Sequence, residues 1–156
     1  MGAGLGVTAV VAALRAPSGA IQCFEGNKQC VRAAQQTAAR NKVTNISFHH
    51  AIVAKAIFVY GSPHDVGTVI PASQIPKCNV LQLDCEGAEV EILRELTIQP
   101  RAILVETHGI YGAPANLVAS LLMERGYVVS DRGLAEPRLG ELHAQQDVRV
   151  LLGRSH

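Results

Sequence analysis

The sequence predicts an α/β fold built on a mostly parallel, Rossmann-like sheet with helices on both faces. Short apolar runs, long enough for buried strands, alternate with segments of helical periodicity along most of the chain. Two of these runs, residues 80–83 and 102–105, are followed by ionisable side chains. In open α/β sheets, ligands bind in the crevice at the carboxyl ends of the strands. The two runs therefore mark the expected functional edge of the sheet.

Length and composition are those of one globular domain, which we expect to span residues 1–156. Apolar residues make up 48% of the chain and charged residues 17%, which is typical of a folded globule and not of a disordered segment. The net charge of +1, without Lys/Arg clusters interleaved with aromatics, argues against nucleic acid as a partner. No apolar run could span a membrane, and no basic segment precedes residues 3–14, so we expect neither a membrane partner nor a signal peptide.

Cysteine usage indicates a reducing compartment. The chain has no C-x-x-C pair, and some of its cysteines lie in or beside apolar runs, where free thiols behave as small hydrophobes. We therefore expect a reduced, cytoplasmic protein. The cysteines are Cys23, Cys30, Cys78 and Cys85.

The chain begins with glycines at alternate positions, followed by an Ala/Val-rich helical segment that ends near Arg15. Gly2, Gly4 and Gly6 would let backbone N–H groups approach a ligand closely. The spacing is G-x-G-x-G, whereas the dinucleotide fingerprint G-x-G-x-x-G would need glycine in place of Val7. A flexible glycine-rich terminus explains the pattern equally well, so this motif alone predicts little.

The next element expected is a strand over residues 20–24 that ends at Glu25. An acid roughly 20 residues after a glycine loop is placed where such folds hold a pair of ribose hydroxyls. The alternative, an exposed charge at a strand end, is less favoured by the spacing. Asn27 can cap the helix that follows, and Asn41 is a plausible stop for it.

Residues 45–53 are expected to form a third strand, with His49 and His50 on opposite faces. Two adjacent imidazoles make a poor start for a metal site, and we expect no metal centre in this chain. Residues 56–60 and 66–70 are expected to form a β-hairpin appended to the core.

The stretch 79–96 carries the strongest signal for a site. Its strand ends at Asp84, and a helical pattern with apolar residues at i, i+4 and i+8 follows at once. A carboxylate that ends an apolar strand needs partners or a ligand to offset its desolvation, so Asp84 is the first candidate. Glu86 and Glu89 fall at the helix N-terminus, where acids stabilise the helix dipole without any chemistry. That interpretation is favoured for Glu89 and equals the catalytic one for Glu86.

The apolar run 102–105 brings Glu106 and His108 to the same sheet edge as Asp84 if the two strands are parallel. Two buried strands would then both end in ionisable residues, which polar loops would not require. This edge is therefore the expected site of chemistry.

The rest of the chain adds a helix and two strands. Pro114 begins a helix with an apolar stripe, and Gly126 ends it. Strands are expected at residues 127–129 and 147–152, and the polar connection between them is left unassigned.

The segments GAGLG, CFEG, LQLDCEGAEVEIL and ILVETHG together resemble the FkbM-type family of S-adenosylmethionine (SAM)-dependent methyltransferases, most closely in LDCEGAE. The resemblance implies a class I methyltransferase-like sheet with an antiparallel C-terminal strand, SAM as cofactor and a small-molecule substrate. The glycines would lie against the methionine part of SAM, Glu25 would bind its ribose, and Asp84 would sit near the transferable methyl. The implied cofactor-binding residues are Gly2, Ala3, Gly4, Gly6, Glu25, Gly26 and Asp84.

The sequence departs from this family at its start. The family places a first strand and an acid just before the glycine loop, and here Met1 stands in that place, so the chain reads as N-terminally truncated. An empty central place in the sheet would leave several backbone groups unpaired. We expect that the true start lies upstream, that the strands ending at Glu25 and Asp84 pair directly, or that a second chain fills the place and makes a homodimer.

The function expected is O-methylation of a small-molecule or sugar hydroxyl. Methyl transfer mainly needs positioning, and a hydroxyl acceptor also needs a base. Two alternatives stay open: a degenerate, non-catalytic relative, and a nicotinamide-dependent oxidoreductase, which Val7 and the lack of a Tyr-x-x-x-Lys set disfavour. The candidate catalytic residues are Asp84, Glu86, Glu106 and His108.

Overall fold

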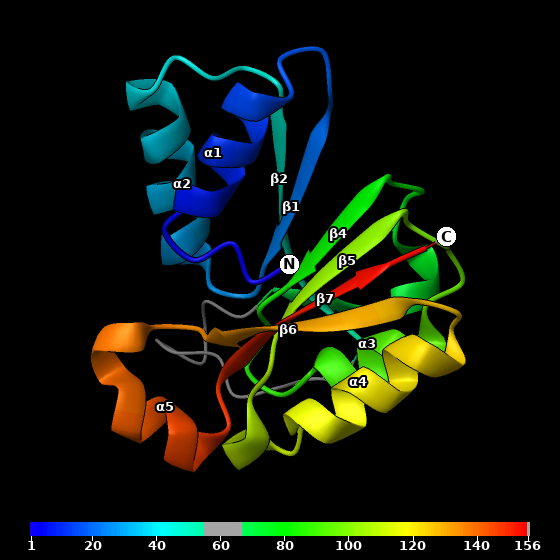
Figure 1. The fold of residues 1–156 in the computed structure, drawn as a ribbon. Coiled ribbons are helices and arrows are strands. Elements are labelled where there is room, and N and C mark those ends of the chain that lie inside the picture. Colours follow the sequence, from blue (N-terminus) through cyan, green and yellow to red (C-terminus); the bar gives the residue numbers. More distant parts are fainter. Residues whose placement is uncertain (55–66, 156) are drawn as a thin grey trace. The chain divides into compact units, whose positions relative to one another are not determined.

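The computed structural model describes residues 1–54 and 67–155. The chain divides into two compact units, Met1–Ile70 and Pro71–His156, and each unit has its own sheet (Figure 1). The single domain expected over residues 1–156 stays a prediction.

The first unit is a three-stranded parallel sheet with two helices. The sheet order is β1-β2-β3, and both strand pairs run parallel. Helices α1 and α2 pack on each other and contact β1 and β2. The elements are α1 (Val7–Arg15), β1 (Ile21–Glu25), α2 (Lys28–Arg40), β2 (Ile46–Val53) and β3 (Thr68–Ile70).

Two local features explain how the helices of this unit begin. Gly6 precedes α1 with φ 81°, and a Cβ there would lie 2.7 Å from the Cβ of Ala34, so only glycine lets the two helices approach this closely. The side chain of Asn27 accepts from the backbone N–H groups of Gln29 and Cys30 at the start of α2. The predicted cap of α2, and its end at Asn41, are confirmed.

The hairpin predicted from residues 56–60 and 66–70 is described only in part. Its first arm lies outside the described residues. Of the second arm, Thr68–Ile70 forms β3 and pairs with β2 in parallel. The pairing of β3 with β2 does not test the hairpin between the two arms, which stays a prediction.

The second unit is a mixed four-stranded sheet of order β4-β5-β7-β6. Strands β4 and β5 are parallel, whereas β7 runs antiparallel between β5 and β6. Its helices and strands are β4 (Val80–Leu83), α3 (Glu89–Glu95), β5 (Ala102–Glu106), α4 (Ala115–Glu124), β6 (Val128–Leu134), α5 (Gly140–Gln146) and β7 (Arg149–Arg154), and its 3-10 turns are η2 (Ala72–Gln74), η3 (Gly109–Tyr111) and η4 (Pro137–Leu139).

The core of this unit lies where α3 and α4 pack together and where α4 packs on β6 and β7 (Figure 1). Fully buried apolar side chains from both helices and from β4 and β5 fill it, which explains why the apolar runs and stripes of the sequence locate these elements well. The predicted α/β class with mostly parallel strands and an antiparallel C-terminal strand is confirmed. The largest of the buried side chains are Leu83, Ile92, Leu93, Ile103 and Leu122.

Within the described residues, β1 pairs with β2 and β4 pairs with β5, and the two strands belong to the sheets of different units. The three arrangements that the sequence left open for the strands ending at Glu25 and Asp84 stay predictions.

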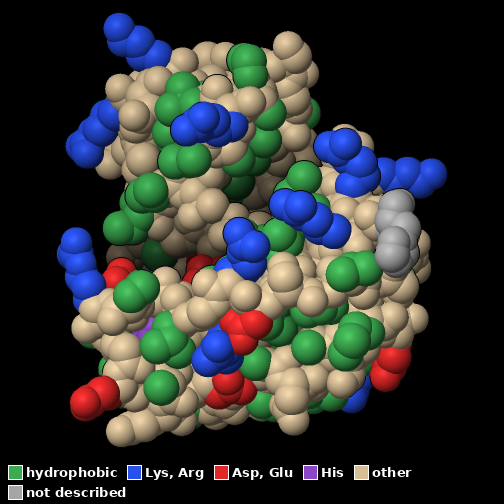
Figure 2. All heavy atoms as spheres, in the orientation of Figure 1, with side chains coloured by type: hydrophobic (Ala, Val, Ile, Leu, Met, Phe, Trp, Pro, Cys, Tyr) green, Lys and Arg blue, Asp and Glu red, His purple; other side chains and the backbone are tan. Residues whose placement is uncertain are grey.

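The described helices include none that is both long enough and apolar enough to cross a membrane. On the face shown in Figure 2, Lys and Arg side chains are scattered and form no continuous basic patch among the described residues. The four cysteines are free.

Candidate functional site

Strands β4 and β5 bring two carboxylates to one sheet edge. The two strands are parallel, and Leu83 stands opposite Val105. Asp84 directly follows β4, and Glu106 is the last residue of β5, so they lie side by side where the strands end. Each side chain is partly buried, with 37% of Asp84 and 32% of Glu106 exposed.

The loop after Asp84 is held by a carboxylate of the helix that follows it. Glu89, fully buried at the start of α3, accepts from the backbone N–H of Cys85 at 2.7 Å and from that of Gly87 at 2.8 Å. Glu86, between them, takes a left-handed backbone with φ 50°. The carboxylate thus fixes the short turn that presents Asp84 and Glu86.

Gly87 is required in this turn on two grounds. Its φ of 98° is a conformation that L side chains rarely adopt. A Cβ at this position would also lie 2.6 Å from the carbonyl oxygen of Tyr111. The turn and the η3 segment therefore approach each other closely only because residue 87 has no side chain.

His108 lies beyond the end of β5 and is only 5% exposed. Its backbone exchanges two hydrogen bonds with Ala113, which fixes its position in the chain. Its Nδ1 lies 2.9 Å from Oε1 of Glu89. We assign the proton of this bond to Nδ1, because Glu89 already accepts two backbone N–H groups through its carboxylate.

The other ring nitrogen of His108 faces carboxylate oxygens. Its Nε2 lies 3.7 Å from Asp84 Oδ1, 3.8 Å from Glu86 Oε2 and 3.9 Å from Glu106 Oε1. We call Asp84, Glu86, Glu106 and His108 the acid–histidine cluster. Glu89 supports this cluster through the opposite ring nitrogen.

The electrostatics of the cluster favour protons or other positive charge. Burial raises the pKa of Asp84, and the charges of Glu86 and Glu89 add to this. Burial, with the charge of Asp84 next, raises the pKa of Glu106 to about 6. Burial alone would lower the pKa of His108, but the hydrogen bond to Glu89 and the charges of the surrounding carboxylates outweigh it, so this pKa is raised.

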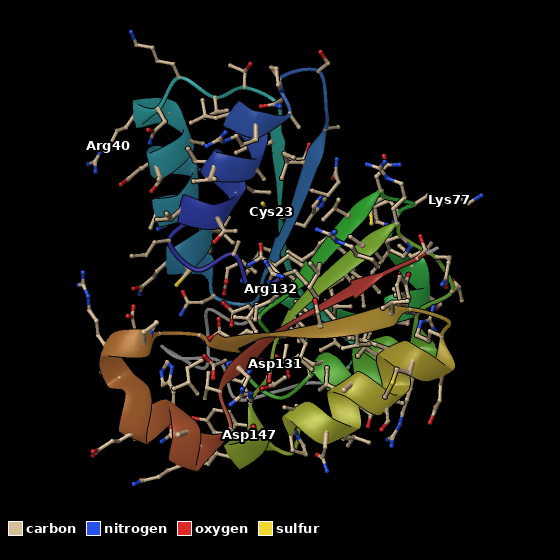
Figure 3. All side chains as sticks on the ribbon, viewed as in Figure 1. Cys23, Arg40, Lys77, Asp131, Arg132 and Asp147 are labelled. Carbon is tan, nitrogen blue, oxygen red and sulfur yellow. The ribbon has the colours of Figure 1, made fainter. Side chains whose placement is uncertain are left out.

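Hydrogen bonds of Thr107 and Asp147 connect the end of β5 to the beginning of β7. The hydroxyl of Thr107 donates to the carbonyl of Asp147 and accepts from the N–H of Arg149. Asp147, at the junction of α5 and β7 (Figure 3), also accepts the N–H of Ala115 on its carboxylate at 2.6 Å. These bonds fix the backbone on either side of His108.

In the first unit, the glycine segment is anchored on β1. The N–H of Gly2 donates to the carbonyl of Phe24, and the N–H of Gly4 donates to Oε2 of Glu25 at 2.8 Å. The other carboxylate oxygen of Glu25 accepts the N–H of Asn27. Glu25 is the only acidic residue among residues 1–64, and a Cβ built at Gly4 would meet nothing within 4 Å.

The structure thus groups the predicted site residues into two sets. The acid–histidine cluster lies in the second unit, and the glycines, Glu25 and Gly26 lie in the first unit at the end of β1. The carbonyl of Gly26 accepts from the N–H of Gly67 and lies 3.1 Å from Nε2 of His50. The cofactor-binding and catalytic roles of these residues stay predictions.

Glu89 has a different role from the one that its sequence position indicated. A helix-terminal charge was expected, whereas the carboxylate is fully buried and bonded to two backbone N–H groups and a histidine. The available signal was its place after a glycine in the EGAE stretch, one turn beyond a strand-end acid. Its partner His108, 19 residues away, could not be read from local spacing.

No protein-family profile and no curated protein matches the sequence. Solved structures do resemble it. The precorrin-6y C5,15-methyltransferase of Geobacter metallireducens is 13% identical, with a TM-score of 0.63, and the match covers 100% of this chain and 78% of that chain. An O-methyltransferase family protein from Burkholderia thailandensis is 12% identical, with a TM-score of 0.63, and covers 99% of this chain and 49% of its own.

A third similar structure is TYW2 of M. jannaschii in complex with AdoMet, which is 11% identical. Its TM-score is 0.51, and the match covers 99% of this chain and 65% of that one. At such identities the likeness shows the fold, and the substrates of these proteins are varied. The chain has the fold of the class I SAM-dependent methyltransferases.

Proposed function

We propose that this chain is a SAM-dependent methyltransferase that uses its glycine segment and Glu25 to bind the cofactor. The observation that carries the proposal is the anchoring of Gly4 on the carboxylate of Glu25. The bond holds the Glu25 carboxylate, which could accept ribose hydroxyls, beside a glycine segment whose backbone a ligand could approach closely. The fold shared with methyltransferases supports the same function.

Glu25 retains capacity for a ligand. Each of its two carboxylate oxygens accepts one backbone N–H, from Gly4 and from Asn27. A carboxylate offers about four lone-pair sites, so about two remain for a pair of ribose hydroxyls. The backbone bonds would hold the carboxylate in place before SAM binds, which lowers the entropy cost of binding.

For the methyl acceptor, we propose the hydroxyl of a small molecule or sugar. The acid–histidine cluster offers carboxylate and imidazole acceptors that could orient such a hydroxyl and receive its proton. SAM would supply a methyl group on a sulfonium, and transfer is an in-line displacement for which positioning is the main requirement. The FkbM-type subfamily, a cytoplasmic location and a homodimer remain predictions beside this proposal.

Calorimetry with SAM and with NAD tests the cofactor. We expect SAM to bind and NAD not to bind. Losing a charged hydrogen-bond acceptor costs about 1.5–3 kcal/mol, so Glu25→Gln should weaken SAM binding roughly 10- to 150-fold. Glu124→Gln, which removes an exposed charge at the end of α4, is the matched control and should bind SAM as the parent does.

Three outcomes would contradict the cofactor assignment. Equal affinity of Glu25→Gln and the parent chain for SAM would remove Glu25 from the site. Binding of NAD in preference to SAM would favour the oxidoreductase that the sequence left open. A chain that binds neither would support the degenerate relative.

Transfer of a labelled methyl group to a panel of hydroxyl compounds tests the acceptor. Once an acceptor is found, Asp84→Asn should lower transfer by ~10²–10⁴-fold, the usual contribution of a positioned acid or base. SAM affinity, measured on the same variant, separates loss of chemistry from loss of cofactor. Unchanged transfer by Asp84→Asn would show that the cluster does not act on the acceptor.

A further inference from the structure

The acid–histidine cluster contains a donor set suited to a metal ion. Asp84, Glu106 and His108 each offer one ligand atom, and these three atoms lie within 4.8 Å of one another. Glu106 and His108 stand two residues apart in an extended segment, so their side chains leave the backbone on the same side. Asp84 comes from the neighbouring parallel strand.

Hydrogen bonds among the described residues do not account for this arrangement. Nε2 of His108 approaches Asp84 and Glu106 only to 3.7 and 3.9 Å, beyond the 2.7–3.2 Å typical of N–H···O bonds. Its Nδ1 has a partner in Glu89, whereas Nε2 has no hydrogen bond within the described part of the chain. A buried imidazole thus directs one nitrogen at carboxylate oxygens without bonding to them.

An ion between the three donors would account for these separations. A divalent transition metal binds imidazole nitrogen and carboxylate oxygen at about 2.0–2.2 Å, which places tetrahedral ligands about 3.3–3.6 Å apart. The two observed nitrogen–oxygen distances, 3.7 and 3.9 Å, are only slightly longer. Small side-chain rotations would bring the three donor atoms to the distances that one bound ion requires.

The surroundings of His108 are those of a metal ligand. A ligating histidine almost always donates its second ring N–H to a carboxylate or carbonyl, which fixes the tautomer and turns the free nitrogen toward the metal. Glu89 makes this contact at 2.9 Å and is itself fixed by the N–H groups of Cys85 and Gly87. This support is buried and complete before any ion binds.

The sequence led us to expect no metal centre, but from this geometry we propose that Asp84, Glu106 and His108 bind a divalent first-row transition-metal ion, with Glu89 as the residue that positions His108. The imidazole ligand favours such ions over Mg²⁺ and Ca²⁺, which prefer oxygen donors alone. The remaining coordination positions would hold water or a substrate oxygen. Ion binding is a property of the second unit and does not depend on the proposed methyl transfer.

The ion would also give the cluster a defined role in the proposed reaction, and this step alone rests on the proposed function. A bound metal lowers the pKa of a coordinated hydroxyl and holds its oxygen in place. The acceptor hydroxyl would then lose its proton more readily, and Glu86, the carboxylate of the cluster that is not one of the three ligands, would take up that proton.

Titration of metal-free protein with MnCl₂, followed by the electron paramagnetic resonance of free Mn²⁺, tests the proposal without SAM. We expect one ion per chain, bound at least tenfold more tightly than Mg²⁺. Asp84→Asn and Glu106→Gln should each weaken binding at least tenfold. The matched controls Asp131→Asn and Glu91→Gln remove an exposed and a partly exposed carboxylate, each paired with an arginine, and should leave Mn²⁺ affinity unchanged.

Experiments with Co²⁺ test whether His108 is a nitrogen ligand and whether Glu89 positions it. The visible spectrum of the Co²⁺-loaded chain should change in His108→Gln, because a nitrogen donor is lost. Glu89→Gln should keep one ion per chain but bind it about 10–100-fold more weakly, as for other residues that orient a ligand. Thermal unfolding of each variant shows which ones are folded, and the two carboxylate variants carry the test if His108→Gln is not.

Three results would overturn the inference. The first is no saturable Mn²⁺ binding at millimolar concentration. The second is a loss of affinity in Asp131→Asn equal to that in Asp84→Asn. The third is Mg²⁺ binding as tight as Mn²⁺, which would mean that the imidazole is not a ligand. If the parent chain binds Mn²⁺ but does not bind SAM, that result would contradict only the proposed function.

Discussion

Single residues in the turn after β4 hold the acid–histidine cluster in place, and a substitution of Gly87 would test this most directly. Gly87 and Gly133 have nearly the same backbone, with φ 98° and φ 97°. A Cβ at Gly87 would lie 2.6 Å from the carbonyl of Tyr111, whereas one at Gly133 would meet nothing within 4 Å. The pair therefore separates backbone strain from steric clash.

We predict that Gly133→Ala lowers the free energy of unfolding by about 1 kcal/mol, the usual cost of a left-handed alanine. Gly87→Ala should lower it by about 2–4 kcal/mol, because a clash with rigid backbone adds to the same strain. Urea unfolding of both variants measures the difference. Equal losses would show that the turn can move away from Tyr111 at little cost.

Ionisation of the cluster should make stability depend on pH. The pKa of Glu106 is raised by burial from 4.5 to about 6, so between these values the folded chain binds more protons than the unfolded chain. The free energy of unfolding therefore falls as pH rises through this window. Asp84 and His108, whose pKa values are also raised, act in the same direction.

We predict a loss of about 1 kcal/mol between pH 4.5 and 6.5 from Glu106, after allowing for solvent screening of a partly exposed group. Urea unfolding in the presence of a chelator measures it, and Glu106→Gln should flatten the profile over this range. A stability that rises across the window in the parent chain would contradict the predicted sign.

At the scale of elements, the sequence located most of the fold because most of the strands and helices bury apolar side chains. Residues 80–83 and 102–105 match β4 and β5 closely. Among the helices, the exception is α5, which has no buried residue and lay in the connection left unassigned. A helix without a buried stripe gives no periodic signal, so only its tertiary contacts locate it.

In the candidate site, too, local patterns predicted some features, whereas others depend on tertiary contacts. Strand ends place Asp84, Glu106 and His108 correctly at one edge, because parallel strands bring their carboxyl ends together. The buried role of Glu89 depends on a contact between two elements distant in sequence. Local patterns predict which groups reach an edge, and they do not predict which partners those groups meet.

The beginning of α2 offers a test at this scale. Asn27 caps this helix through bonds to the N–H groups of Gln29 and Cys30. We predict that Asn27→Ala lowers the free energy of unfolding by about 0.5–2 kcal/mol and that Asn27→Ser restores most of it. Thermal unfolding of the two variants measures this. Failure of serine to recover any stability would assign the loss to packing and not to the cap.

At the scale of the whole molecule, the two units differ in how their strands follow one another in the chain. Strands β1, β2 and β3 are neighbours in the sheet in the same order as in the sequence. In the second unit, β7 follows β6 in the sequence but lies between β5 and β6. Residues 149–154 therefore join the two halves of that sheet.

This order of strands has a consequence for chains that lack β7. Without residues 149–154, β6 has no neighbour in the described sheet and β5 lacks one, so such a chain exposes strand edges that could pair with other chains. We predict that a chain ending at residue 146, purified free of the ribosome, is protected from protease over residues 1–54 but cleaved within 71–134, and that the chain extended through residue 154 is protected in both ranges. Equal protection at the two lengths would contradict this. Chains that have not yet placed β7 would thus be the species most exposed to misassembly, and the ones that a chaperone would have most to shield.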